Sequence, residues 1–338
     1  MKRHFTFALL LLVLTISGQA QQKQVPALFQ DEKPLALSLK FSFKEVKKEK
    51  VDSVYFPTYF GYTNDTGKYD SIAIKVRARG NFRRNNCFYP PIRVKLKKKD
   101  GEGTPFEDNK DFKLVLPCQT GKLGSDLILK EYLCYKILEP ITPYFFHTRL
   151  VDLELTDLSG KPKTYSVKSF LIEDDDLIAH RFNGKVVEQD IHPLTLSDTT
   201  SVLFDFFQYL IANTDWSAAQ QHNVKIIQTA NKKIPLTYDF DMAGLVNAPY
   251  ATVNETLTIS SVQERLYRGF CRSEPLMQYA RKEYLRLEPA IMKVISDNKS
   301  LFNEKDYKGI EKFVSEFFET LKNDKKFKEA VLLGCRTK

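Results

Sequence analysis

The first half of the chain alternates hydrophobic and polar residues over short stretches. In residues 35–43, leucine or phenylalanine occupies every second position, and alanine, serine or lysine lies between. A period of two predicts strands that are buried on one face. The predicted strands are residues 35–43, 54–62, 71–77, 92–96, 112–116, 149–155 and 164–172. Because the first connections are short polar turns, we expect antiparallel pairing.

Helical spacing interrupts this alternation once and then dominates the second half. Apolar residues recur at helical intervals from Leu127 to Leu138, Ser125 or Asp126 offers an N-cap, and Pro140 ends the helix. Three more helices are predicted over residues 202–212, 274–295 and 307–321.

The two patterns predict an α+β fold of two lobes. Residues 21–176 form a strand-rich lobe, an antiparallel sheet plus one helix, and residues 177–338 form a mainly helical lobe. The acidic run 173–176 is expected to connect them. A cleft between lobes is where a ligand is expected to bind.

The amino terminus is typical of a secretory signal peptide, residues 1–20. Basic residues 2–3 precede an apolar run from Phe5 to Ile16, and small residues follow up to Ala20. The run is short for a bilayer, and no later stretch approaches the length of a transmembrane helix. We therefore expect an exported protein, periplasmic or secreted, with no transmembrane segment after signal removal.

Cysteine usage agrees with an oxidising compartment. The five cysteines, Cys87, Cys118, Cys134, Cys271 and Cys335, show no metal-binding spacing. One or two disulfides are expected, first between Cys87 and Cys118 because both lie near predicted strands of one lobe, and at least one thiol stays free. Buried reduced cysteines are the alternative.

The formal net charge of +9 is a modest basic excess. Its densest run, Lys95–Lys99 with Arg93 before it, is interpreted as a solvated strand edge or turn, a polyanion-binding patch, or a phosphate contact. No aromatic residues interleave with these bases as in a single-strand nucleic-acid platform, so no nucleic-acid partner is expected.

Candidate chemistry gathers in residues 209–245. Asp215 and Asn223 occupy a polar turn after a helix end, and a hairpin then delivers Asp239 and Asp241. Side chains two apart on a strand point to the same side, so these two carboxylates are expected to aim at one point. Such oxygen ligands suit Mg²⁺. The alternative is that these residues cap a helix and turns.

The order of several motifs resembles the CotH-type kinases, secreted relatives of the protein-kinase-like fold, with a more distant similarity to the HipA-like arrangement. The resemblance covers residues 72–245. Its motifs are RGN at Arg79, the strands PPIRVKL and DFKLVLPC, Leu129–Glu131 in the helix, the strand end at Glu173, and finally Asp215, Asn223 and the YDFD turn.

The resemblance implies a two-lobed protein-kinase-like fold and phosphoryl transfer from ATP, with Mg²⁺ or Mn²⁺, to a hydroxyl of a secreted or envelope protein or glycan. In that case Asp215 would orient or deprotonate the hydroxyl, and Asn223, Asp239 and Asp241 would hold the metal. For the nucleotide, either Lys95 or Arg93 would contact the phosphates, and Arg79 is another candidate for that contact. Glu131 would pair with the phosphate-binding Lys95 or Arg93. Glu173 would lie at the nucleotide edge.

Two other functions remain open. One is a catalytically silent protein of the same fold that binds an envelope partner, and the other is a metal-dependent phosphoester hydrolase. No GxSxG or HExxH motif points to a serine hydrolase or a zinc protease. The sequence leaves the oligomeric state unknown.

Overall fold

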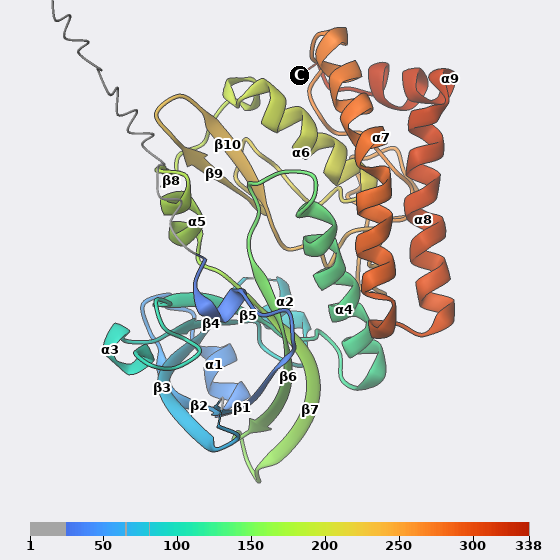
Figure 1. Ribbon diagram of the computed structural model, residues 1–338. Helices are drawn as coiled ribbons and strands as arrows, with labels where there is room; N and C mark the ends of the chain where they lie inside the picture. The colour runs from blue at the N-terminus through green and yellow to red at the C-terminus, as the bar shows by residue number, and fades with distance from the viewer. Residues whose placement is uncertain (1–24, 65, 81, 338) are drawn as a thin grey trace, which may run out of the picture.

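The computed structural model describes residues 25–64, 66–80 and 82–337 (Figure 1). The expected signal peptide, residues 1–20, lies outside the described residues. Among the described residues, no helix combines the length and the hydrophobicity that crossing a bilayer requires.

Seven strands close into a barrel in the order β1-β2-β3-β4-β5-β7-β6. Neighbours pair antiparallel except β1 and β6, which run parallel with Leu35 opposite Val151 and Phe41 opposite Asp157. The strands are β1 (Leu35–Phe41), β2 (Phe56–Thr63), β3 (Tyr69–Ala78), β4 (Ile92–Lys95), β5 (Asp111–Val115), β6 (Thr148–Asp157) and β7 (Lys163–Ile172).

The barrel interior is filled by the hydrophobic positions of the alternating strands. In β1 every second residue is buried, as the period of two requires. Phe60, Phe106 and Phe112 stack at the centre, with ring centroids 5.6 to 6.3 Å apart. Phe60 belongs to β2 and Phe112 to β5, so the stacked rings join strands that are not neighbours in the sheet, through their buried apolar area.

The other elements are short helical segments, longer helices and a second sheet. The short ones are η1 (Ala27–Phe29), α1 (Phe43–Lys48), α2 (Phe82–Asn86), α3 (Lys98–Gly101), α5 (Asp175–Arg181), η2 (Pro193–Thr195), η3 (Lys299–Leu301), α9 (Asp324–Phe327) and a π-helical turn η4 (Lys328–Leu332). The long ones are α4 (Gly121–Leu138), α6 (Asp198–Leu210), α7 (Glu274–Asp297) and α8 (Glu304–Lys322). A second, antiparallel sheet contains β8 (Lys185–Val187), β9 (Val224–Gln228) and β10 (Lys233–Thr237).

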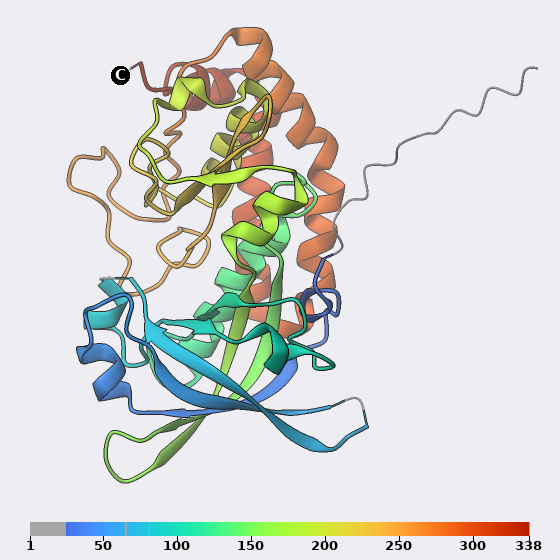
Figure 2. The same ribbon diagram turned by 90° about the vertical axis from the view of Figure 1, so that its left-hand side faces the viewer.

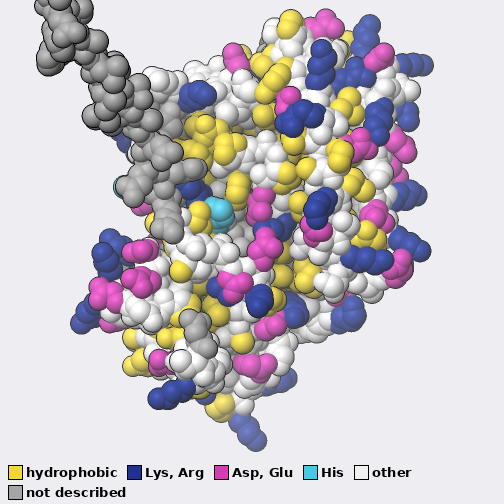
Figure 3. All heavy atoms as spheres, viewed as in Figure 1, with side chains coloured by type: hydrophobic (Ala, Val, Ile, Leu, Met, Phe, Trp, Pro, Cys, Tyr) yellow, Lys and Arg dark blue, Asp and Glu magenta, His cyan; other side chains and the backbone are white. Residues whose placement is uncertain are grey.

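Helix α4 joins the barrel to the other helices. It packs on β7 on one side and on α7 on the other. One hydrophobic core runs from Phe170 and Ile172 of the barrel through Tyr135 of α4 to Phe207 of α6 and Phe317 of α8. Figures 1 and 2 show the barrel at one end of the molecule, and α7 and α8 on the side of α4 that faces away from the barrel strands. In Figure 3, basic and acidic side chains intermingle over the outer surface of these two helices, as expected of their solvent face.

The expectation of a two-lobed kinase-like fold is wrong. The first part of the chain is a closed mixed barrel, not an antiparallel sheet with one helix, because β1 pairs parallel with β6 and closes the sheet. It also carries the short helices α1, α2 and α3 besides α4. Alternation along single strands carries no information on which strands become neighbours, so closure was not visible in the sequence.

Two local predictions also need correction. The N-cap of helix α4 is Thr120, rather than Ser125 or Asp126, and the helix begins at Gly121. The acidic run expected to be a connector instead begins helix α5, with Asp175 and Asp176 in its first turn. Carboxylates there are favourable because the first turn presents unpaired backbone N–H groups.

The cysteines follow the first expectation. Cys87 is joined to Cys118, which confirms the predicted pair, and a second disulfide joins Cys271 to Cys335. Cys134 is a free, buried thiol on α4.

Candidate functional site

A cleft of about 530 Å³ lies where the ends of β3, β4 and β5 meet the β9–β10 hairpin. Six basic side chains and four carboxylates line it, together with apolar and neutral residues. The charged lining residues are Arg77, Arg79, Arg83, Arg93, Lys113 and Lys225, with Asp175, Asp215, Asp239 and Asp241; His222 and Asn223 also line the cleft. The structure therefore brings the four residues of the predicted catalytic and metal set into one cavity.

The two hairpin carboxylates reach the cleft by a turn rather than by strand alternation. Strand β10 ends at Thr237, so Asp239 and Asp241 lie beyond it. Asp239 has a φ of 65°, a left-handed conformation that Asp tolerates better than most residues. Its N–H donates to the hydroxyl of Tyr135 at 2.9 Å, which fixes the turn against α4. The sequence argument placed both carboxylates at one point, and they do line one cavity, but the expected strand geometry is wrong.

Asp215 is held in a network of polar contacts. Its N–H donates to Oδ1 of Asn213 at 3.0 Å. The amide nitrogen of Asn223 donates to the backbone oxygen of Asp215 at 2.8 Å and to its Oδ2 at 3.0 Å. Because the nitrogen makes both contacts, the amide oxygen of Asn223 is the atom that a cation would contact.

His222 binds the other oxygen of Asp215, with 2.9 Å between Nε2 and Oδ1. This hydrogen bond raises the pKa of His222 despite partial burial, and the charges of Asp215 and Asp239 act in the same direction. Both oxygens of Asp215 thus have a partner. The contacts orient the carboxylate toward the cleft rim, where the side chain is 41% exposed.

A buried ionic cluster lies behind Asp239 and Asp241. Arg83 of α2 approaches Glu131 Oε2 and Asp239 Oδ1 at 3.9 Å and Asp241 Oδ2 at 3.8 Å. Arg83 is itself anchored by donating to the backbone oxygen of Leu116. Burial raises the pKa of Glu131 to about 8 and that of Asp241 to about 6, although Arg83 opposes both shifts.

The cluster is incompletely satisfied. Among the described residues, no hydrogen-bond partner reaches three of its buried carboxylate oxygens: Glu131 Oε1, Asp239 Oδ1 and Asp241 Oδ2. Buried oxygens of this kind are costly unless something pairs with them. A divalent cation fits this need.

Among all the residues that the structure describes, no group of three His, Cys, Asp or Glu side chains is already arranged to hold one metal ion. Two carboxylates and an amide can nevertheless hold Mg²⁺, because this ion usually keeps waters and takes further ligands from substrate phosphates. The residues present, Asn223, Asp239 and Asp241, therefore fit such an ion.

The basic residues of the cleft, which we call its basic wall, differ in how far neighbouring carboxylates already neutralise their charges. Arg93 donates to Asp111 at 2.6 Å and to Asp174 at 3.1 Å. Lys113 donates to Asp175 at 2.7 Å. By contrast, Nε of Arg79 is buried with no hydrogen-bond partner among the described residues. Arg79 therefore retains donor capacity for an anionic ligand.

Three of the residues expected at the nucleotide do not line the cleft: Glu131, Lys95 and Glu173. Glu131 is buried, and its charged neighbour is Arg83, at 3.9 Å, rather than Lys95 or Arg93. Lys95 is not among the residues lining the cleft: it lies on the outer barrel surface, with its Nζ 4.7 Å from the Tyr55 ring centroid. Lys95 and Arg93 share one face of β4, two residues apart, and Lys95 is exposed at the end of the strand that lies outside the cleft. Glu173 is completely buried, and its two oxygens accept from Arg181 at 2.7 and 3.2 Å, so it supports the fold.

The sequence reasoning missed four basic residues of the cleft: Arg77, Arg83, Lys113 and Lys225. For Lys113 a signal was present, because a lysine flanked by Phe112 and Leu114 in a fully buried strand segment requires a partner. For Arg83 and Lys225 we find no comparable signal, since their neighbourhood depends on how α2 and β9 are placed.

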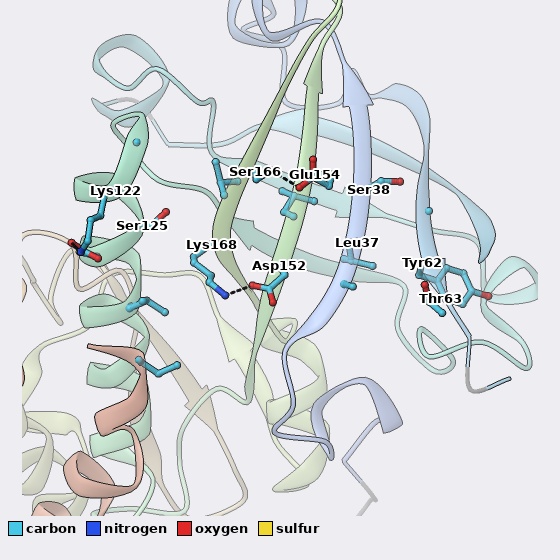
Figure 4. Close-up of a pocket in the computed structure, with 18 of the residues that line it drawn as sticks. Leu37, Ser38, Tyr62, Thr63, Lys122, Ser125, Asp152, Glu154, Ser166 and Lys168 are labelled. Carbon is cyan, nitrogen blue, oxygen red and sulfur yellow. Dashed lines mark hydrogen bonds and ion pairs between the residues drawn. The ribbon is translucent and has the colours of Figure 1, made fainter. Parts of the chain in front are cut away.

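A larger groove, about 870 Å³, lies on another side of the barrel, between α4 and the outer faces of β1, β2, β6 and β7. Figure 4 shows Ser166, Glu154 and Ser38 in a row across its strands. Two ion pairs, Lys168 with Asp152 and Lys122 with Asp126, already satisfy most of its charges. The groove offers volume without unpaired buried carboxylates, so the smaller cleft is the better candidate for chemistry.

Comparison of the chain with protein-family models and with curated proteins finds no match.

Proposed function

We propose that this protein transfers a phosphoryl group from ATP to a hydroxyl of a secreted or envelope protein or glycan, with Mg²⁺ or Mn²⁺ as cofactor. The observation that carries the proposal is the juxtaposition, in one cleft, of a basic wall and buried carboxylate oxygens that no hydrogen bond reaches among the described residues. A phosphate ester bound to a divalent ion needs both features, carboxylates to hold the ion and basic side chains to bind the phosphate. The CotH-type resemblance implies the same activity.

The residues divide the work by position. Asp239, Asp241 and Asn223 would hold the ion, whose charge offsets that of the phosphates. Arg79 is placed to bind phosphate oxygens, since no hydrogen bond from the described residues engages its Nε. Asp215, on the rim and oriented by His222 and Asn223, is placed to accept the proton of the attacking hydroxyl.

Arg83 takes a role that the sequence did not suggest. Its guanidinium lies behind the metal-binding carboxylates and balances part of their charge. In this proposal Arg83 prevents three neighbouring carboxylates from repelling one another before the ion binds.

Export is part of the proposal. The two disulfides support an oxidising compartment, as the leader-like first 20 residues do.

The test is phosphoryl transfer by the purified chain with ATP and Mg²⁺ or Mn²⁺, scored on its own hydroxyls and on envelope proteins and glycans. Asp239→Asn and Asp215→Asn are each expected to lower kcat about 100-fold or more, the usual effect of removing such a group. Asp176→Asn is the matched control, because Asp176 is an exposed carboxylate of the nearby helix α5. It should retain normal activity.

Three results would overturn the proposal. Full activity in Asp239→Asn would remove the metal assignment. Metal-dependent turnover of phosphoesters that is indifferent to ATP would indicate a hydrolase. Failure of Mg²⁺-ATP to raise the melting temperature would indicate a silent binding protein, because saturation at 100 times the dissociation constant adds about 2.7 kcal/mol of stability.

A further inference from the structure

The outer face of β3 and β4 carries two successive pairs of facing bases. In the antiparallel register Arg77 lies opposite Arg93, and Lys75 lies opposite Lys95. Like charges directly opposite each other on one face of a sheet are destabilising. With Lys97 just beyond β4, these residues form what we call the basic strip: Lys75, Arg77, Arg93, Lys95 and Lys97.

The arginine pair and the lysine pair differ in how far nearby carboxylates neutralise their charges. Arg77 donates to Asp52 at 2.6 Å, and Arg93 is paired with Asp111 and Asp174, so the arginine pair is neutralised. Lys95 reaches Asp111 only at 3.9 Å. Among the described residues, no ion pair reaches Lys75 or Lys97. The lysine end of the strip therefore keeps an uncompensated positive charge.

The lysine end of the basic strip also lines a concave surface. A groove of about 550 Å³ is lined by Lys75, Lys95 and Lys97, by Pro57 and by the ring of Tyr59. Tyr59 is 63% exposed, so its ring is open to a ligand. Asp100 is the single carboxylate among the lining residues that the structure describes. Positive charge, a concave surface and an open aromatic face thus occur together.

The surface has no backbone edge to offer. Strand β3 is paired on both sides, to β2 and to β4, and β4 is paired also to β5. A peptide therefore has no unpaired strand to extend here, and recognition must come from side chains alone. Ammonium groups that meet carboxylates and a tyrosine ring that stacks on a sugar ring provide such recognition.

We propose that the basic strip and its groove bind an anionic polysaccharide, a chain whose sugar rings carry carboxylate groups. The lysines neutralise the acidic groups, and Tyr59 packs on a sugar ring. Arg77 and Arg93 line the cleft as well, so the strip runs without a break from the groove to the candidate site. The bound polymer therefore extends toward the place where a hydroxyl would react.

The binding site does not depend on the proposed phosphotransfer, because it is tested without nucleotide. Polygalacturonate is titrated into the purified full chain and binding is followed by calorimetry, with neutral dextran and poly-glutamate as comparison polymers. Polygalacturonate is expected to bind more tightly than either, and the affinity should fall as salt rises from about 0.05 to about 0.5 M, since exposed charges are screened.

The variant Lys75→Glu with Lys95→Glu is expected to weaken binding at least tenfold. The matched control, Lys325→Glu with Lys326→Glu, makes the same charge change on exposed positions of α9 and should bind as the unmodified chain does. Tyr59→Ala, which leaves the charge unchanged, should weaken polygalacturonate binding while leaving any poly-glutamate binding unaltered. If the glutamate variant fails to fold, the corresponding glutamine variant and Tyr59→Ala carry the test.

Unchanged binding in the Lys75 and Lys95 variant would overturn the site. Equal binding of poly-glutamate, with no effect of Tyr59→Ala, would show that the strip takes acidic peptides rather than sugars. Equal binding of dextran would show that charge has no part in recognition.

Discussion

At the residue scale, Asp205 on α6 is a buried carboxyl away from the cleft. It is 7% exposed, and it lies close to Gly269, where an added Cβ would approach its Oδ2 to 2.5 Å. Burial raises the pKa of Asp205 to about 8 from the ordinary 3.8, although Arg272 and Arg336 oppose the shift. The folded protein therefore holds this proton at a pH where the unfolded chain has released it.

The sign of the pH effect follows from proton binding. Between pH 3.8 and about 8 the folded state binds more protons at Asp205 than the unfolded state, so this group's contribution to stability is lost as pH rises. We expect Asp205→Asn to remove this dependence of the unfolding free energy on pH. Between about pH 5 and 7, the unfolding free energy of the unmodified chain should fall, relative to that of the variant, by about 1 kcal/mol per pH unit.

Urea denaturation at several pH values measures this difference. Asp190→Asn, an exposed carboxylate, is the control and should leave the profile parallel to that of the unmodified chain. Parallel profiles for Asp205→Asn as well would contradict the raised pKa.

At the scale of elements, two helical glycines predict opposite outcomes for the same substitution. Replacing glycine by alanine inside a helix usually stabilises by about 1 kcal/mol. Gly309 on α8 has no atom within 4 Å of an added Cβ, so Gly309→Ala should stabilise the protein by about 0.5 to 1 kcal/mol. Gly124 on α4 differs, because its Cβ would lie 2.0 Å from the backbone oxygen of Gln119.

Gly124→Ala is therefore expected to destabilise the protein by about 2 kcal/mol or more, since a rigid backbone atom must move. Thermal and chemical denaturation of the two variants side by side measure the contrast. A stabilising Gly124→Ala would mean that the loop before α4 yields easily.

Helix and strand positions were largely predictable, and their caps were not. The strands expected over residues 35–43 and 149–155 correspond to β1 and β6, and the helix expected over residues 274–295 is α7. These segments bury a regular face, so their periodicity is visible locally. The predicted N-cap of α4 lies five or six residues after the observed one, Thr120, because the first turn, with Gly121 and Gly124, packs against the preceding loop rather than showing a side-chain cap.

At the scale of the whole molecule, a disulfide fastens the carboxyl-terminal end. Cys271 is bonded to Cys335 across 64 residues, and backbone hydrogen bonds of 2.9 Å join Arg336 to Gly269 and to Cys271. The bond closes a loop that contains α7 and α8. Loop-closure entropy predicts that removing it costs about 4 kcal/mol.

We expect the double variant Cys271→Ser with Cys335→Ser to lose about 2 to 5 kcal/mol in urea denaturation. The unmodified chain treated with reductant should lose at least as much, because it also loses the Cys87–Cys118 bond. A double variant as stable as the oxidised chain would show that the packing of α7 and α8 holds this end by itself.

The sequence by itself determined the local structure and the chemical inventory. Periodicity located strands and helices, and the polar residues of 209–245 identified Asp215, Asn223, Asp239 and Asp241, which do share one cleft. Only the tertiary structure decided that the strands close into a barrel and that Arg83 balances the carboxylates. It alone decided too that Lys95 faces outward while Glu173 is buried. The reason is physical: periodicity reports which face of an element is buried, whereas neighbours distant in the chain depend on how the elements pack together.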